Sequence, residues 1–208
     1  MIPVLYSFRR CPFAMRARMA LVYSGIQVEL REVELSDMPE SMLRLSPKAT
    51  VPVLVLGDGQ VIDESLDVML WSLAQADPDQ WLDIDETSSQ LIRRSDEEFK
   101  PLLDCYKYAD RHPQLTPLEH RARAEVFVDE LNQLLNRHAY LSDDQCRLTD
   151  MAIFPFIRQF AGVDAAWFDS SQYSSVRSWL NGLLAHDLFQ RIMSKNPFWQ
   201  PGDEARYL

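Results

Sequence analysis

The sequence is poor in several features that define large classes of proteins. It has three cysteines in 208 residues, widely separated, which argues against a disulfide framework. These cysteines and the four histidines do not show the spacing of zinc ligands, so we expect no metal. No apolar run approaches the ~20 residues that a bilayer-spanning helix needs, and the N-terminus lacks a signal-peptide pattern. We therefore expect a cytoplasmic protein.

Positive charge is also scarce. The chain carries 21 Lys and Arg against 31 Asp and Glu, a formal net charge of −10. Nucleic acids and anionic membranes attract basic surfaces, so neither is expected as a partner. Hydrophobic residues make up 47% of the sequence, which is enough for a sizeable core. The length suits one large domain or two small ones.

The first 76 residues alternate between strand and helix patterns. The predicted strands are residues 3–7, 28–35, 50–56 and 60–62, and the predicted helices are residues 12–24, 39–45 and 63–75. Gly25 ends the first helix, and Gly57-Asp58-Gly59 is predicted to form a tight hairpin turn. The order β-α-β-α-β-β-α indicates a small mixed sheet covered by helices, an α/β domain.

The rest of the chain shows helical patterns only. Residues 77–86 contain the turn cluster Asp77-Pro78-Asp79 and are predicted to be a linker. The predicted helices beyond it are residues 88–111 with a bend at Pro101, 117–138, 149–161, 174–185 and 187–194. The expected domains are therefore an α/β domain at residues 1–76 and an all-helical bundle at residues 87–208.

Cys11 is the strongest candidate for chemistry. It directly precedes Pro12, which is tolerated in a first helical turn, so the cysteine falls at the start of the first helix. The free N–H groups and the dipole of a helix N-terminus favour a thiolate over a thiol. Arg9, Arg10 and Arg16 add positive charge nearby. Cys105 and Cys146 lack this context and are expected to be structural.

Two further stretches of the first domain suggest a binding site. Pro52 begins an otherwise good strand, and a cis Val51–Pro52 peptide would expose the preceding backbone groups to a ligand. Glu64-Ser65 opens the third helix, where N–H groups and a hydroxyl can hold a carboxylate and Glu64 can pair with an ammonium group. Without a ligand, Pro52 would only mark a bulge in the strand, and Glu64-Ser65 would only cap the third helix.

Taken together, these motifs resemble the cytosolic glutathione transferase superfamily, in particular its omega-like and bacterial cysteine-type branch. The stretches that carry the resemblance are Cys11-Pro12-Phe13-Ala14, Thr50 to Leu54, Asp63-Glu64-Ser65 and Thr149 to Phe156. The resemblance spans nearly the whole chain. It implies an N-terminal thioredoxin-like (glutaredoxin-like) domain followed by a C-terminal helical bundle domain.

The resemblance also implies roles for single residues. Cys11 would be the nucleophile that forms a mixed disulfide with the co-substrate glutathione, flanked by Phe13. Val51, before a cis Pro52, would pair its backbone with the cysteinyl part of glutathione. Glu64 and Ser65 would hold the γ-glutamyl amino and carboxylate groups. An unidentified small-molecule or disulfide acceptor would lie against Tyr106, Tyr108 and Phe160, and the protein would be a homodimer.

The sequence departs from the family pattern at three positions. Met38 replaces a lysine that usually reaches the glycine carboxylate of glutathione, and Lys48 is the nearest substitute. Ala14 replaces the second cysteine of a dithiol glutaredoxin, so disulfide chemistry should use one thiol, with glutathione resolving it. Arg147 replaces a Ser or Thr helix cap, a loss that typically costs ~1 kcal/mol.

Three functions remain open from the sequence. The first is a glutathione-dependent thiol transferase or reductase that uses Cys11. The second is a glutathione-conjugating transferase acting on electrophiles, in which the hydroxyl of Tyr6 or Ser7 is the alternative activating group. The third is a non-catalytic interaction protein, because this fold also serves for binding alone.

Overall fold

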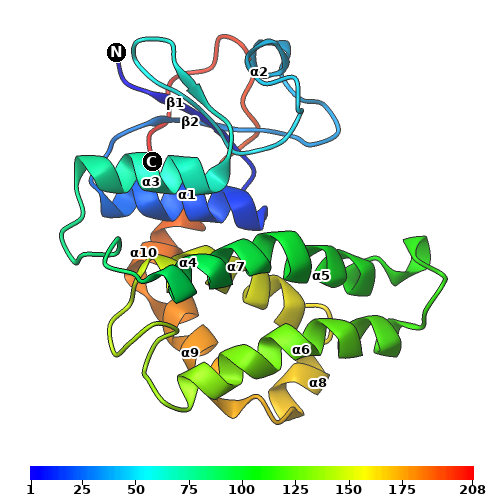
Figure 1. Ribbon diagram of the computed structural model, residues 1–208. Helices are drawn as coiled ribbons and strands as arrows, with labels where there is room; N and C mark the ends of the chain where they lie inside the picture. Colours follow the sequence, from blue (N-terminus) through cyan, green and yellow to red (C-terminus); the bar gives the residue numbers. More distant parts are fainter. The chain divides into compact units, whose positions relative to one another are not determined.

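The structure is a computed structural model that describes all 208 residues as two compact units (Figure 1). The first unit contains residues 1–79 and residues 186–208, and the second contains residues 80–185. The C-terminal segment therefore lies with the first unit, whereas the sequence analysis assigned everything beyond residue 86 to the helical domain. No helix is both long and apolar enough to cross a membrane.

The first unit is built on a four-stranded mixed sheet with the order β2-β1-β3-β4. Its strands are β1 (Val4–Ser7), β2 (Glu29–Glu32), β3 (Val53–Val55) and β4 (Val61–Ile62). β1 pairs with β2 in parallel and with β3 antiparallel, and β3 pairs with β4 antiparallel. Its helices are α1 (Pro12–Tyr23), α2 (Glu40–Leu45), α3 (Ser65–Gln75) and α10 (Asp187–Ile192). The predicted β-α-β-α-β-β-α order of the first domain is confirmed.

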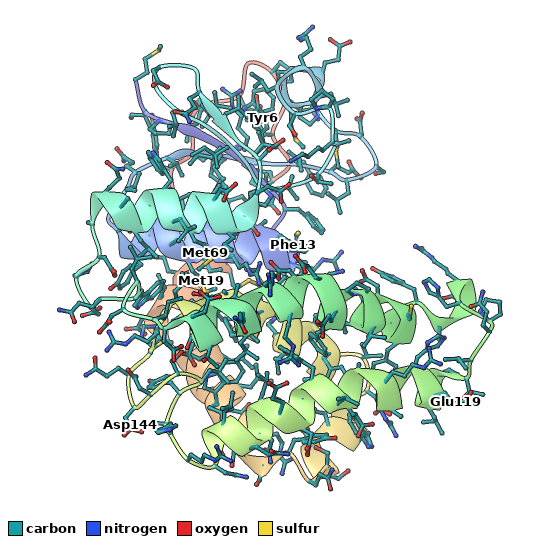
Figure 2. The ribbon with its side chains drawn as sticks, in the orientation of Figure 1. Tyr6, Phe13, Met19, Met69, Glu119 and Asp144 are labelled. Atoms are coloured by element: carbon teal, nitrogen blue, oxygen red, sulfur yellow. The ribbon has the colours of Figure 1, made fainter.

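The two faces of the sheet carry separate hydrophobic clusters. Successive strand residues point to opposite faces, so Leu5 and Tyr6 of β1 belong to different clusters. Leu5 packs with Leu21 of α1 and Val68 of α3, which lie side by side along one face (Figure 1). Tyr6 packs with Met42 of α2. Figure 2 shows Tyr6 in the sheet layer and Phe13 at the N-terminal end of α1.

The C-terminal segment follows the edge of β2. The N–H of Trp199 donates to the carbonyl of Glu32 at 2.8 Å, and the N–H of Leu208 donates to the carbonyl of Val28 at 3.1 Å. The guanidinium carbon of Arg31 lies 4.3 Å from the Trp199 ring centroid, a cation–π contact. These contacts cover the edge of the sheet and explain why the C-terminal segment belongs to the first unit.

The second unit is helical throughout, as predicted. Its helices are α4 (Glu86–Arg94), α5 (Lys100–Lys107), α6 (Pro117–Leu135), α7 (Leu148–Ala161), α8 (Ala165–Ser170) and α9 (Ser174–Ala185). A π-helical turn, Ser95–Phe99, separates α4 from α5. It comes just before Pro101, which lacks the N–H needed to continue a regular helix, so the predicted bend takes this form. The short helix α8 was not predicted.

The start of α7 retains half of the cap that the sequence was expected to lose. Arg147 is the N-cap residue, and its backbone N–H donates to Asp150 Oδ2 at 3.1 Å. Asp150 Oδ1 accepts hydrogen bonds from the N–H of Leu141 at 3.0 Å and from Trp179 Nε1 at 2.8 Å. A buried carboxylate with three donors therefore substitutes for a hydroxyl cap.

Candidate functional site

Cys11 lies where β1 ends and α1 begins. Its backbone is extended, with φ −73° and ψ 123°. It is the N-cap residue of α1, and Pro12 is the first residue of the helix. Its N–H donates to the carbonyl of Phe8 at 3.0 Å, and its own carbonyl accepts the N–H of Met15 at 2.9 Å. The predicted position of Cys11 at a helix N-terminus is confirmed. The side chain is partly exposed.

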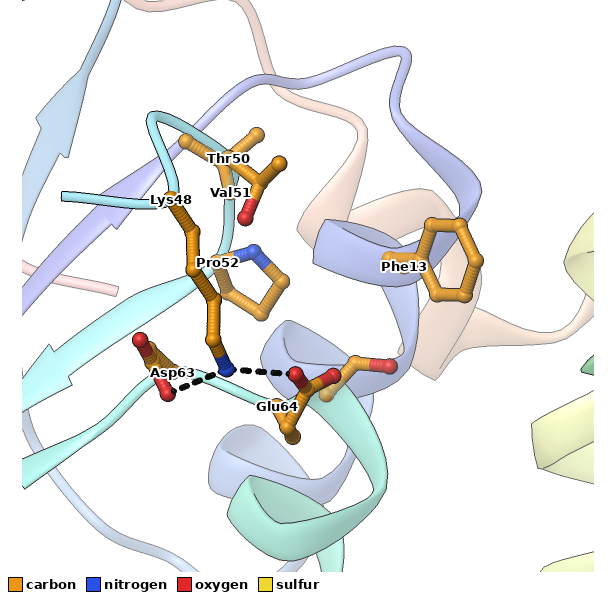
Figure 3. Close-up of a pocket in the computed structure, with 8 residues that line it drawn as sticks. Phe13, Lys48, Thr50, Val51, Pro52, Asp63 and Glu64 are labelled. Atoms are coloured by element: carbon orange, nitrogen blue, oxygen red, sulfur yellow. Dashed lines mark hydrogen bonds and ion pairs between the residues drawn. The ribbon is translucent and has the colours of Figure 1, made fainter. Parts of the chain in front are cut away.

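A pocket of about 410 Å³ opens in the first unit (Figure 3). This volume falls within the range of about 300–1,000 Å³ typical of small-molecule sites. The residues that line it are Phe13, Lys48, Thr50, Val51, Pro52, Asp63, Glu64 and Ser65. All the residues named from the sequence as glutathione ligands therefore meet in one pocket. The Cys11 sulfur donates to the Val51 carbonyl at 3.7 Å.

The Val51–Pro52 peptide bond is cis, as predicted from the sequence. Val51 is nearly fully buried in the hydrophobic cluster around Tyr6, so its side chain anchors this wall of the pocket. Its carbonyl accepts the hydrogen bond from the Cys11 sulfur, and the same residue lines the pocket. The cysteine and the backbone of the predicted ligand strand are therefore direct neighbours.

Lys48 bridges two carboxylates in the pocket. Its Nζ lies 2.6 Å from Glu64 Oε1 and 3.1 Å from Asp63 Oδ1 (Figure 3). The hydrogen bond to Glu64, followed by the one to Asp63, raises the pKa of Lys48. A hydrogen bond from Ser46 and then the contact with Lys48 lower the pKa of Asp63. The pocket thus already holds an ammonium group against the acidic residues at the start of α3.

Sequence reasoning underestimated this bridge. Lys48 was considered only as a substitute for the lysine missing at Met38, and Asp63 was noted only as part of the motif that opens α3. Met38 itself packs against the hydrophobic cluster around Tyr6 and does not line the pocket. The available signal was the pair of adjacent acidic residues, Asp63 and Glu64, together with Lys48, a lone lysine shortly before the predicted strand at residues 50–56.

The Tyr6 hydroxyl is hydrogen-bonded elsewhere, and the Ser7 hydroxyl is buried. The Tyr6 hydroxyl donates to Ser41 Oγ at 3.1 Å and accepts from Arg31 Nη1 at 2.8 Å. Ser7 is fully buried, whereas Cys11 is partly exposed. These contacts favour Cys11 over Tyr6 or Ser7 as the reactive group.

The residues expected to face an acceptor lie in the second unit. Tyr106 and Phe160 are nearly fully buried, with ring centroids 5.6 Å apart, and belong to an aromatic cluster with Phe99. Tyr108 is partly exposed and has Lys107 and Arg111 against its ring. The first two residues therefore contribute mainly to the core. No group of three or more His, Cys, Asp or Glu side chains is arranged to hold a metal ion.

Comparison with known proteins shows which protein family this chain resembles. The sequence profile described as "Glutathione S-transferase, N-terminal domain" matches residues 5–81. Glutathione S-transferase omega-1 of Mus musculus is 25% identical over 164 residues, which cover 77% of this chain and 68% of that protein. A probable glutathione transferase of Aplysia californica is 39% identical over 71 residues, which cover 34% of this chain and 75% of that protein.

A solved structure agrees over nearly the full length. The glutathione transferase URE2P6 of Phanerochaete chrysosporium, in complex with oxidized glutathione, has a TM-score of 0.79 at 14% identity, covering 92% of this chain and 94% of that one. The architecture is thus that of a glutathione transferase, a thioredoxin-like domain followed by a helical one. The chain belongs to the cytosolic glutathione S-transferase superfamily, with an omega-like relationship.

Proposed function

We propose that this protein is a glutathione-dependent thiol transferase with Cys11 as its nucleophile. The observation that carries the proposal is the position of Cys11 at the N-terminus of α1, with its sulfur 3.7 Å from the carbonyl of Val51 on the pocket wall. The helix N-terminus favours the thiolate, which is the reactive form of a cysteine. The similarity to omega-class transferases supports the same assignment.

The reaction proceeds by two thiol–disulfide exchanges. The Cys11 thiolate attacks the glutathione sulfur of a mixed disulfide between glutathione and the acceptor, and the acceptor leaves as a thiolate that takes up a proton. Cys11 is then disulfide-bonded to glutathione. A second glutathione thiolate attacks the glutathione sulfur of that bond, which releases oxidized glutathione and regenerates the Cys11 thiolate. Ala14 leaves no second thiol in the motif, so glutathione itself resolves the intermediate.

The pocket supplies recognition groups for each part of glutathione. The Val51 carbonyl accepts the Cys11 S–H in the free thiol and becomes available to a peptide N–H once Cys11 is a thiolate. Ser65, at the N-terminus of α3, suits the γ-glutamyl carboxylate, and Glu64 suits its ammonium group. Phe13 flanks the reacting sulfurs. Lys48 already occupies Glu64 and Asp63, so the ligand ammonium must displace or share it.

Two further parts of the proposal concern partners. The acceptor is a small molecule or a disulfide, and the protein acts in the cytoplasm as a homodimer. Glutathione binding is supported by the structural relative that holds oxidized glutathione. No metal enters the mechanism we propose.

The test is a deglutathionylation assay with a glutathionylated peptide and excess glutathione. Wild type should turn over, Cys11→Ala should lose at least about 100-fold in kcat/KM because the nucleophile is gone, and Cys105→Ala is the matched control. Equal turnover by Cys11→Ala would overturn the proposal. Conjugation to an aryl halide that survives in Cys11→Ser would favour a conjugating transferase, and failure of wild type to bind millimolar glutathione would favour a non-catalytic protein.

A further inference from the structure

A carboxylate and a guanidinium are buried directly behind the loop that presents Cys11. Glu32 is the last residue of β2 and is 4% exposed, and Arg18 in α1 is fully buried. Arg18 Nη1 lies 3.8 Å from Glu32 Oε2, so the two form an ion pair without a direct hydrogen bond. Charged side chains are rarely buried to this extent unless paired. The pair therefore requires an explanation.

Both side chains form hydrogen bonds with the backbone of the same residue, Arg9. The N–H of Arg9 donates to Glu32 Oε1 at 2.5 Å, and the carbonyl of Arg9 accepts from Arg18 Nη2 at 2.5 Å. Arg9 is two residues before Cys11, whose own N–H is held by the Phe8 carbonyl. The turn between β1 and α1 is thus fixed from both sides by opposite charges.

Stability alone does not account for this arrangement. Three buried polar atoms of this region have no hydrogen-bond partner: Glu32 Oε2, Arg18 Nε and Ser7 Oγ. Ser7 pairs with Glu32 in the sheet register. A partly satisfied buried network costs free energy, and buried ion pairs are often replaceable by apolar residues without loss. Groups of this kind are concentrated at functional sites. The residue that both side chains hold, Arg9, is two residues before Cys11.

We propose that Arg18 and Glu32 are positioning residues that hold the Cys11 turn in place and act on the charge of its sulfur in opposite directions. The proposal rests on the proposed function of Cys11. The positive charge of Arg18 favours the Cys11 thiolate, whereas the negative charge of Glu32 disfavours it. The pair lets the fold hold the turn with two strong hydrogen bonds while leaving the sulfur with an intermediate reactivity.

The electrostatics link Arg18 to Cys11, and Glu32 to Arg18 and Arg9. Burial lowers the pKa of Arg18 to about 10, and its interactions with Glu32 and Cys11 oppose that change. Burial raises the pKa of Glu32, which the Arg9 N–H and Arg18 partly offset. Arg18 is seven residues after Cys11, about 10 Å along the helix axis, and its guanidinium reaches back to the Arg9 carbonyl.

Other charged groups lie near Cys11 in sequence, at the pocket, or on the helices packed against α1, and they stay the same in every variant of Arg18 and Glu32 below. These are Arg9, Arg10 and Arg16 on its own turn and helix, Lys48, Asp63 and Glu64 at the pocket, the exposed Asp67 of α3, and the exposed Asp187 and Arg191 of α10. Differences between variants of Arg18 and Glu32 therefore report the pair alone.

The experiment measures the Cys11 thiol pKa in Arg18→Gln, Glu32→Gln and the double variant. The alkylation rate with iodoacetamide is followed against pH, and the peptide that carries Cys11 is quantified by mass spectrometry. The amide that Glu32→Gln introduces can still accept from the Arg9 N–H, so that change removes mainly charge. We expect Glu32→Gln to lower the thiol pKa by about 0.5–1, Arg18→Gln to raise it by about 1, and the double variant to return close to wild type. Asp67→Asn is the matched surface control.

A merely structural pair would give a different result. If both single variants loosened the turn, the thiol pKa would move in the same direction in both, and that outcome overturns the proposal, as does no change in either. Should Arg18→Gln fail to fold, Glu32→Gln decides alone by the sign of its change, and Arg18→Lys, which keeps the charge, should stay near wild type. The assay contains no glutathione, so it separates this inference from a failure of the proposed function.

Discussion

The first unit contains two charge clusters that differ in their exposure to solvent. Lys48, Asp63 and Glu64 meet in the pocket, where the side chains of Lys48 and Glu64 are 50% and 64% exposed. Arg18 and Glu32 meet behind the Cys11 turn, with side chains that are 1% and 5% exposed. One cluster lines the pocket, and the other holds Arg9 in the turn before Cys11.

The contrast assigns the clusters different tasks. Exposed ion pairs contribute little to stability and exchange readily with solvent ions, so the pocket cluster can open for a charged ligand. A buried pair cannot exchange in this way, because removing one partner leaves an uncompensated charge. We therefore expect the pocket cluster to control binding and the buried pair to control stability and thiol reactivity.

The sharpest way to break this comparison is to remove one half of the buried pair. Arg18→Met should lower the free energy of unfolding by about 3–5 kcal/mol, because it leaves Glu32 buried without a counter-charge. The double variant Arg18→Met with Glu32→Met should recover much of that loss, since no unpaired charge remains. Urea unfolding followed by circular dichroism measures both. A double variant that is less stable than the single one would contradict the account.

Asp150 in the second unit is also a buried carboxylate, and it accepts three hydrogen bonds. Burial raises the pKa of Asp150 to about 6, against the hydrogen bonds from Leu141, Arg147 and Trp179. Between about pH 6 and pH 4, the Asp150 carboxylate takes up a proton in the folded state but not in the unfolded state. The contribution of Asp150 to the free energy of unfolding therefore rises as the pH falls. Wild type should gain about 1–3 kcal/mol relative to Asp150→Asn between pH 7 and pH 4.5.

Urea titrations of both proteins at the two pH values provide this difference, and the other carboxylates cancel from it. A gap between the two proteins that stays constant with pH would show that the three donors fully offset the effect of burial. In that case Asp150 would remain a carboxylate throughout the range, and it would act only as the cap of α7.

The pocket cluster should show the reverse pattern. Glu64→Gln should weaken glutathione binding about 10-fold, because a neutral amide replaces a charge-assisted hydrogen bond to the ligand ammonium. Its urea midpoint should match that of wild type, since the side chain is largely exposed. Isothermal titration calorimetry measures the affinity, with Asp67→Asn on the same helix as the control. Unchanged affinity would remove Glu64 from the site.

The smallest effect is expected for Lys48→Met. Its urea midpoint should lie within error of wild type, and the dependence of glutathione affinity on salt should change, because the ligand ammonium no longer competes with a protein ammonium. Titrations at low and high salt test this. A large loss of stability would show that Lys48 is a structural element of the first unit.

Much of the site could be predicted because its residues form short, contiguous motifs. Cys11-Pro12 specifies a helix start through the proline, and Pro52 at the beginning of a good strand pointed to a cis peptide, although a bulge or an edge strand was also open. Glu64-Ser65 specifies the start of α3 in the same way. Local rules of this kind do not depend on which distant segments meet.

The features that were missed depend on long-range contacts. The Lys48 bridge needs the loop before β3 to meet the start of α3, and the Arg18–Glu32 pair needs the register of β2 against β1. The segment around Trp199 and Leu208 has no pattern of its own, because its pairing and its ring contact with Arg31 are made to β2 and its flanks. Helix α8 spans six residues, too few for periodicity to reveal.

The central claim is that Cys11 is the thiol that exchanges with glutathione. The most direct measurement is to incubate the wild-type protein with oxidized glutathione, digest it without a reductant, and identify which cysteine carries glutathione by mass spectrometry. We predict a mixed disulfide on Cys11, formed faster than on Cys105 or Cys146 and reversed by added glutathione. Modification of Cys105 or Cys146 in place of Cys11, or none at all, would contradict the account.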